Sequence, residues 1–251
     1  MPELSALGWA LLALGALVIG LSKAALPGAA TIAVALFAAV LPAKQSTGTI
    51  LLLLIVGDVF ALWAYRRHAD ARSLLRLVPA VLVGLLLGVV FLAVASDVGV
   101  RRVIGVILLA VVGVTLWRRR TRPDGHTAGA GRTAAVVYGG LGGFTTMVAN
   151  AAGPIMAMYF LAARFEVKAF LGTAAWFFAV VNIAKVPFSI GLGLITADGL
   201  LVVAVLVPAV IAGALVGRAI ASRIPQALFD RLVIGVTIAG ALYLLLAPGA
   251  A

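Results

Sequence analysis

Three charged residues, Lys23, Asp58 and Lys185, stand inside long apolar runs of the sequence. A charge at the centre of a bilayer costs at least about 2.5 kcal/mol on insertion scales, so such a residue is functional by default. Asn182 lies three residues before Lys185, and residues at that spacing share one face of a helix. Two lysines and one aspartate leave a net positive charge. The sequence therefore predicts a buried site for a small anion.

Asp58 has two roles that the sequence leaves open. In the first, it is a coupling residue whose carboxylate carries a proton during transport. In the second, it is the structural partner of Lys23 or Lys185, because charges inside membranes commonly pair with each other. The two roles differ in what should follow when the carboxylate is neutralised.

Two breaks interrupt apolar elements of the sequence. Pro27-Gly28 forms the first break, and the stretch from Asn150 to Gly153-Pro154 forms the second. Proline lacks a backbone N–H group and clashes with the preceding turn, so a helix should end at each place. The half-helix that follows would begin with unpaired N–H groups and a partial positive charge, which favours an anion. The alternative is that these residues only kink ordinary membrane helices.

The residues that we expect to contact the substrate come from both breaks and from the charged helices: Lys23, Pro27, Gly28, Asn150, Gly153, Pro154, Asn182 and Lys185. Asp58 is the candidate coupling residue. Residues 176–178, a tryptophan and two phenylalanines, are interpreted as helix packing. The chain has no cysteine, and its two histidines lie in or beside basic segments without paired acids. We therefore expect no catalytic residue, no metal site, no cofactor and no enzymatic activity.

The elements that must position these residues recur in two halves of the chain. The pattern Lys-x-x-x-Gly-Thr at residues 44–49 returns at residues 168–173, and ten residues after each glycine comes Asp58 or Asn182. Two further patterns also recur, at 79–88 and 208–217 and at 101–106 and 231–236. The glycine pairs in 79–88 and 208–217 predict close helix contacts. Such duplication is typical of secondary transporters, whose substrate lies where the halves meet. As repeat-mates, Asp58 and Asn182 should face each other.

Apolar runs of helical length predict an all-α membrane protein: 6–22, 28–41, 46–65, 73–95, 99–117, 134–149, 153–163, 169–190, 196–217 and 228–247. A run of about 20 residues can span the hydrocarbon core. Residues 6–41 as one straight helix would be about 54 Å long, far more than a core of about 30 Å. This element is therefore either a kinked crossing or a hairpin that enters and leaves by the same face.

The distribution of basic residues separates these two topologies. Fourteen of the nineteen Lys and Arg residues lie in four short segments: 66–76, 118–132, 164–168 and 218–231. Positive segments should be cytoplasmic. Segments 118–132 and 164–168 share one side only if the element between them is a re-entrant hairpin. We therefore predict two inverted repeats, each a broken, re-entrant helix hairpin plus three transmembrane helices, with both termini external. A uniform model with eight crossings ranks second.

These boundaries divide the chain into a first membrane repeat at 1–117, a basic cytoplasmic linker at 118–132 and a second membrane repeat at 133–251. Hydrophobic residues make up 64% of the chain and charged residues only 11%, which excludes an ordinary soluble domain. The net charge of +11 is spread over short loops between apolar runs, so we expect a lipid bilayer and no nucleic acid as partner.

The second half of the chain resembles the sulfite exporter TauE/SafE family. The resemblance lies in residues 144–161 (FTTMVANAAGPIMAMYFL), residues 172–178 (GTAAWFF) and residues 182–188 (NIAKVPF), and it extends over essentially the whole chain. It implies a permease for sulfite or for small organosulfur or sulfonate anions. It also implies a multi-pass integral protein of the bacterial inner (cell) membrane.

The predicted function is thus a secondary transporter of a small anion bound near the membrane midplane between the repeats, with proton coupling through Asp58 as a further hypothesis. An anion channel, or a carrier of a carboxylate or another non-sulfur substrate, is the alternative. The direction of transport is not encoded in any feature above. The oligomeric state is not either, and a homodimer is left open.

Overall fold

The computed structural model describes residues 4–26, 28–94 and 132–221, together with scattered positions within 106–113 and 223–242. Within these ranges all regular structure is helical: α1 (Ala6–Ala24), α2 (Ala30–Ala38), α3 (Ala43–Tyr65), the short 3₁₀ helix η1 (Arg66–His68), α4 (Ala71–Val94), α6 (Arg132–Ala149), α7 (Ala152–Ala162), α8 (Val167–Gly191) and α9 (Ala197–Ala221). The prediction of an all-α protein is confirmed for this part of the chain. Most of the predicted run 99–117, the linker 118–132 except Arg132, and much of the run 228–247 lie outside the described residues.

Five helices are long and apolar enough to cross a membrane: Ala6–Ala24, Gln45–His68, Ala71–Phe91, Val167–Gly191 and Ala197–Ala221. Their outward surfaces carry large apolar side chains, such as Leu75 and Leu87 on α4, which are 72% and 58% exposed. Lipid tails can cover such surfaces at no cost, whereas water cannot. The chain is therefore a multi-pass integral membrane protein.

The first predicted break separates α1 from α2, and the chain folds back on itself there. Gly15 of α1 packs against the ring of Phe37 in α2, and Gly8 packs against Val40 just after α2. The second pair is more widely separated in sequence than the first, and the two members of each pair lie on opposite sides of the break. Contacts of this kind define an antiparallel helical hairpin. The two helices are unequal, because α1 has 19 residues and α2 has 9. At about 1.5 Å per residue α1 is longer than the half-helix that was expected.

The second predicted break separates α6 from α7 in the same manner. Gly142 of α6 packs against Met156 of α7. Further from the break, the rings of Tyr138 and Tyr159 lie 5.8 Å apart between centroids. Both breaks therefore lie at the tips of helical hairpins, and a simple kink in one continuous helix does not describe either of them.

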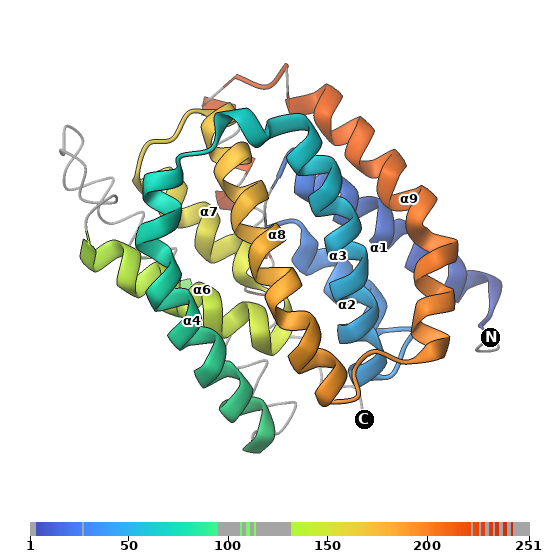
Figure 1. Ribbon diagram of the computed structural model, residues 1–251. Coiled ribbons are helices and arrows are strands. Elements are labelled where there is room, and N and C mark those ends of the chain that lie inside the picture. Colours follow the sequence, from blue (N-terminus) through green and yellow to red (C-terminus); the bar gives the residue numbers. More distant parts are fainter. Residues whose placement is uncertain are drawn as a thin grey trace.

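Helices from the first half of the chain pack against helices from the second half. Figure 1 shows α1 beside α9 at one end of the molecule and α4 beside α6 at the other, with α3 and α8 between them, and these pairs make the most extensive helix contacts. Each outer pair is joined through glycines: Gly20 and Gly213 between α1 and α9, and Gly84 and Gly143 between α4 and α6. A β-carbon on any of these four would collide with a backbone carbonyl oxygen of the partner helix. The predicted role of Gly84 and Gly213 in close helix contact is confirmed.

We expect Gly20→Ala to destabilise the protein by about 1–3 kcal/mol, because its new methyl group would overlap the carbonyl oxygen of Val210 and the helices would have to separate. The measurement is the midpoint of thermal unfolding in detergent. Gly191→Ala is the matched control, since an added β-carbon there has no described atom of another part of the chain within 4 Å. Equal midpoints for the two variants would contradict the close contact.

The recurring Gly-Thr pairs hold the turns of the opposite half. A β-carbon on Gly48 of α3 would collide with the carbonyl oxygen of Leu194 in the α8–α9 turn. A β-carbon on Gly172 of α8 would collide with the backbone of Tyr65, the last residue of α3, and of His68 in the α3–α4 turn. Thr173 Oγ1 also accepts a hydrogen bond of 2.9 Å from the backbone N–H of Asp70. This reciprocal packing holds α3 against α8, the two helices that carry Asp58, Asn182 and Lys185.

Asp70 fixes the start of α4 in that turn. Its Oδ1 accepts the backbone N–H groups of Arg72 and Ser73 at 3.0 and 3.2 Å, and its Oδ2 accepts the hydroxyl of Ser73 at 2.9 Å. Burial raises the pKa of the Asp70 carboxyl, but the hydrogen bonds from Ser73 and Arg72 outweigh this effect and hold the pKa below its usual value. Asp70 therefore stays ionised and caps the helix at neutral pH.

Candidate functional site

Lys23 and Asp58 form an ion pair in the interior of the helix bundle. Lys23 lies in the last turn of α1 and Asp58 lies past the middle of α3. The Nζ atom of Lys23 is 2.6 Å from Oδ1 of Asp58, and the two side chains are only 7% and 2% exposed. Asp58 is therefore the ion-pair partner of a lysine, which is one of the two roles predicted for it. The pairing partner is Lys23, and a role of Asp58 as proton carrier stays a prediction.

Asn182 on α8 holds the other oxygen of the same carboxylate. Its Nδ2 donates to Oδ2 of Asp58 at 2.7 Å, so the predicted meeting of these repeat-mates is confirmed. A carboxylate can only accept hydrogen bonds, so the amide must turn its nitrogen toward Asp58 and its oxygen away. That oxygen, Oδ1 of Asn182, is buried and has no hydrogen-bond partner among the described residues.

Lys185 lies one helical turn beyond Asn182 and is 2% exposed. Its Nζ donates to Oδ1 of Asn150 at 2.5 Å and to Oγ1 of Thr146 at 3.3 Å. An ammonium group has three N–H donors, so these two bonds leave one donor over. Among the described contacts of Lys185, neither acceptor is charged, so the positive charge of this lysine is held by neutral oxygens.

Asn150 is the residue at the tip of the second hairpin. Its backbone φ of 53° is left-handed, a conformation that asparagine adopts more readily than most residues. Its Nδ2 donates to the backbone oxygen of Thr47 at 3.3 Å, while its Oδ1 accepts from Lys185. The side chain of Asn150 thus connects the α6–α7 tip to α3 and α8.

The tips of the two hairpins touch each other. A β-carbon on Gly28, whose φ is 119°, would lie 3.6 Å from the backbone of Pro154. Ser22 closes the first tip: its hydroxyl accepts the N–H of Ala30 at 3.1 Å, at the start of α2, and donates to the carbonyl of Leu26 at 3.2 Å. Pro27, also predicted to be in the site, lies outside the described residues.

The start of α7 differs from the start of α2, because no side chain caps it. Pro154 is the third residue of α7. An N–H group at this position would have no acceptor within the helix, so a proline costs no hydrogen bond there. The N–H groups of the first helical residues, Ala152 and Gly153, have no acceptor within the helix either. The positive end of the α7 dipole therefore lies at the second tip.

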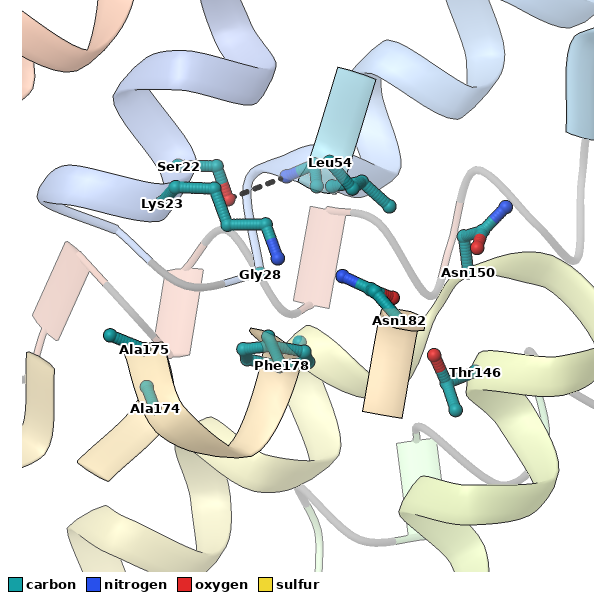
Figure 2. Close-up of a pocket in the computed structure, with 12 residues that line it drawn as sticks. Ser22, Lys23, Gly28, Leu54, Thr146, Asn150, Ala174, Ala175, Phe178 and Asn182 are labelled. Carbon is teal, nitrogen blue, oxygen red and sulfur yellow. Dashed lines mark hydrogen bonds between the residues drawn. The ribbon is translucent and has the colours of Figure 1, made fainter. Parts of the chain in front are cut away.

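A cavity lined mostly by buried residues lies between the two tips and α8. Its volume is about 20 Å³. The residues around it come from both halves of the chain: Ser22, Lys23, Gly28, Ala30, Leu54, Thr146, Asn150, Gly153, Ala174, Ala175, Phe178 and Asn182. Figure 2 shows Lys23 reaching down from α1, Asn182 and Phe178 rising from α8, and Thr146 and Asn150 on the other side.

The structure thus brings most of the predicted site residues together. The cavity is lined by Lys23, Gly28, Asn150, Gly153 and Asn182. Asp58 and Lys185 lie behind this lining, since each contacts residues that form it. Pro154 contacts Gly28 at the meeting of the tips. No described residue of the predicted set lies far from the cavity.

Phe178 belongs to the cavity although the sequence was interpreted as placing it in helix packing. The Nζ atom of Lys23 lies 4.4 Å from the centroid of its ring, a geometry in which the electron-rich face attracts the cation. The sequence did contain a signal, because Phe178 precedes Asn182 by four residues and therefore shares its helix face. The ring and the carboxylate of Asp58 both contact the Lys23 ammonium.

A family model described as sulfite exporter TauE/SafE matches residues 12–244, which include all described helices apart from the first residues of α1. The match covers both hairpins and every residue of the cavity. No curated protein and no solved structure matches the chain.

Proposed function

Because the chain belongs to the sulfite exporter TauE/SafE family, whose members are membrane transporters and not enzymes, we propose that it is a secondary transporter of a small sulfur-containing anion such as sulfite or a sulfonate. The substrate binds in the cavity between the two hairpin tips. The observation that carries this proposal is the meeting of two helix breaks at a cavity that is lined by Lys23 and has Asp58 and Lys185 directly behind its lining.

The charges around the cavity favour an anion. With Lys23, Asp58 and Lys185 ionised, the formal charge is +1, and water is largely excluded from all three side chains. A negative ligand would neutralise this charge in a medium of low polarity, where electrostatic interactions are strong. The uncapped start of α7 adds N–H donors and a partial positive charge beside Gly153.

The small size of the cavity favours a carrier over an open pore. A volume of about 20 Å³ holds one water molecule but no sulfur oxyanion. Binding therefore requires the walls to move apart. Movement of one half of the chain against the other around a fixed site is the usual mechanism of secondary transporters with internal repeats.

We further propose that the two halves are inverted repeats with re-entrant hairpins. The packing of α1 with α9 and of α6 with α4, and the fold-back of each hairpin, are what a two-fold axis between the halves would produce. An odd number of crossings in each repeat would place that axis in the membrane plane. The rival topology has α1 crossing the membrane, which its 19 residues allow. The positive segments 118–132 and 164–168 favour the inverted arrangement, because both then face the cytoplasm.

Single cysteines placed in segments 118–132 and 164–168 should react with an impermeant thiol reagent from the same side of the membrane. The chain has no cysteine of its own, so the unmodified protein is the background control. A third cysteine at Gly193, in the α8–α9 turn, should react from the opposite side. Labelling of the first two segments from different sides would exclude the inverted topology.

Counterflow in proteoliposomes tests the transport function itself. Vesicles that contain the full chain and a high internal concentration of sulfite should accumulate labelled external sulfite transiently and saturably. Large currents that do not saturate would identify an anion channel. Counterflow of acetate but not of sulfite would identify a carboxylate carrier.

The coupling hypothesis predicts that Asp58→Asn makes sulfite transport independent of a proton gradient, because the asparagine cannot bind and release a proton. In the native protein, protonation of Asp58 would break its ion pair and free Lys23 for the substrate. The measurement is sulfite flux with and without an imposed pH difference at equal mean pH. A variant that retains the full response to the gradient would remove Asp58 from the coupling pathway.

A further inference from the structure

The most informative atom of the cavity is Oδ1 of Asn182. The residue is 1% exposed, yet this oxygen has no hydrogen-bond partner among the described residues. Its direction is determined, since the bond from Nδ2 to Asp58 forbids the flipped amide, which would turn an oxygen toward a carboxylate. Figure 2 shows the nitrogen of Asn182 on the side of Lys23 and the oxygen on the side of Thr146 and Asn150.

No donor among the described residues around the cavity forms a hydrogen bond with this acceptor. Lys23 is engaged with Asp58 and lies over the ring of Phe178. Lys185 donates to Asn150 and Thr146, and the amide nitrogen of Asn150 donates to the backbone of Thr47. A buried acceptor without a donor is costly, so native structures nearly always supply one. Because Asn182 lines the cavity, a group that enters the cavity is in a position to supply this donor.

The formal charge of the residues around the cavity determines which charge is favoured in a group that enters it. Lys23, Asp58 and Lys185 are the ionisable groups that surround Asn182, and together they carry a formal charge of +1 when ionised. A monoanion would bring the buried total to zero, whereas a dianion would leave an uncompensated negative charge. Uncompensated charge in a medium of low polarity is strongly disfavoured.

We propose that the cavity selects an oxyanion of charge −1 that carries its own O–H group, and that this hydroxyl donates a hydrogen bond to Oδ1 of Asn182. For sulfite, this chemistry corresponds to the hydrogensulfite ion and not to the doubly charged form. The inference rests on the proposed function, because it names the ionic form that the same site accepts. The remaining oxygens of the ligand accept from the spare N–H of Lys185 and from the start of α7.

Two ligands of equal charge and nearly equal shape test the hydroxyl requirement. Hydroxymethanesulfonate and ethanesulfonate are both monoanions, and they differ only in having a hydroxyl or a methyl group at the same place. Binding of each to the purified full chain is measured by calorimetry, with sulfate as the dianion. We expect hydroxymethanesulfonate to bind about ten-fold more tightly than ethanesulfonate, and sulfate to bind more weakly than either.

Two variants test whether the preference for the hydroxyl group depends on Asn182. Asn182→Leu should bring the affinity ratio of the two sulfonates close to one, because the acceptor is gone; the ratio is informative even if both affinities fall. Thr49→Val is the matched control. Its hydroxyl oxygen is also buried and has no hydrogen-bond partner in the described part of the chain, but Thr49 does not line the cavity. This variant should keep the ten-fold ratio of the native protein.

The outcomes distinguish a failure of the hydroxyl requirement from a failure of the proposed transport function. Equal affinities of the native protein for the two sulfonates would overturn the hydroxyl requirement and leave the transport function standing, as would a preserved preference in Asn182→Leu. Tightest binding of sulfate would overturn the choice of a monoanion. Absence of both binding and counterflow for sulfite and for both sulfonates would overturn the proposed function, and the selectivity with it.

Discussion

Lys23→Met should destabilise the protein by about 3–5 kcal/mol, because it leaves the carboxylate of Asp58 buried without its cation. The side chain of Asp58 is 2% exposed, and its Oδ1 atom lies 2.6 Å from the ammonium nitrogen that would be lost. Asn182 would still donate one hydrogen bond to the carboxylate, but a neutral donor replaces only a part of the lost interaction. The measurement is the thermal midpoint and the yield of folded protein in detergent.

The double variant Lys23→Met/Asp58→Asn separates loss of charge balance from loss of packing. Removal of both charges leaves no uncompensated ion, so most of the lost stability should return. Lys168→Met, an exposed change of the same type on α8, serves as the control and should have little effect. If the double variant were no more stable than the single one, the ion pair would not be the source of the loss.

Lys185→Met should weaken sulfite binding by about ten- to a hundred-fold, because hydrogen bonds from a charged donor contribute about 1.5–3 kcal/mol. The change also lowers the formal charge of the site from +1 to zero, which removes the attraction for a monoanion. The expected loss exceeds that for any neutral residue of the cavity. Binding of sulfite to the purified variant, measured by calorimetry, gives the ratio directly.

The stability of the Lys185 variant must be measured in the same samples, since Oδ1 of Asn150 loses a donor as well. The affinity is therefore referred to the folded fraction. Lys168→Met is again the control, because it removes one positive charge from the same helix outside the cavity. Native affinity in Lys185→Met would mean that this lysine only supports Asn150 and Thr146.

The helices and both breaks were predictable because they depend on local properties. Apolar runs of sufficient length form membrane helices, and Pro-Gly or Gly-Pro pairs interrupt them wherever they stand. The ends of the observed helices accordingly lie within a few residues of the predicted runs. Gly48 and Gly172 are different, since their repetition was visible but their contact with the turns of the opposite half required the packed structure.

The site was predictable in part. The repeat identified Asp58 and Asn182 as mates, and a two-fold relation places mates near each other, as their hydrogen bond of 2.7 Å confirms. The sequence does not distinguish Lys23 from Lys185 as the partner of Asp58, because their distances depend on how α1 and α8 approach α3. Phe178 was interpreted as packing, since an aromatic residue in an apolar helix has no local mark of a binding role.

The amino-acid sequence by itself determined a helical membrane chain with two broken elements and three intramembrane charges, because hydropathy, proline and charge act over a few residues. Only the tertiary structure decided that Lys23 pairs with Asp58, that Lys185 is held by neutral oxygens, and that the amide oxygen of Asn182 has no donor among the residues that the structure describes. The physical reason is that these contacts join residues far apart in the chain, and their geometry exists only once the glycine-lined helices have packed together.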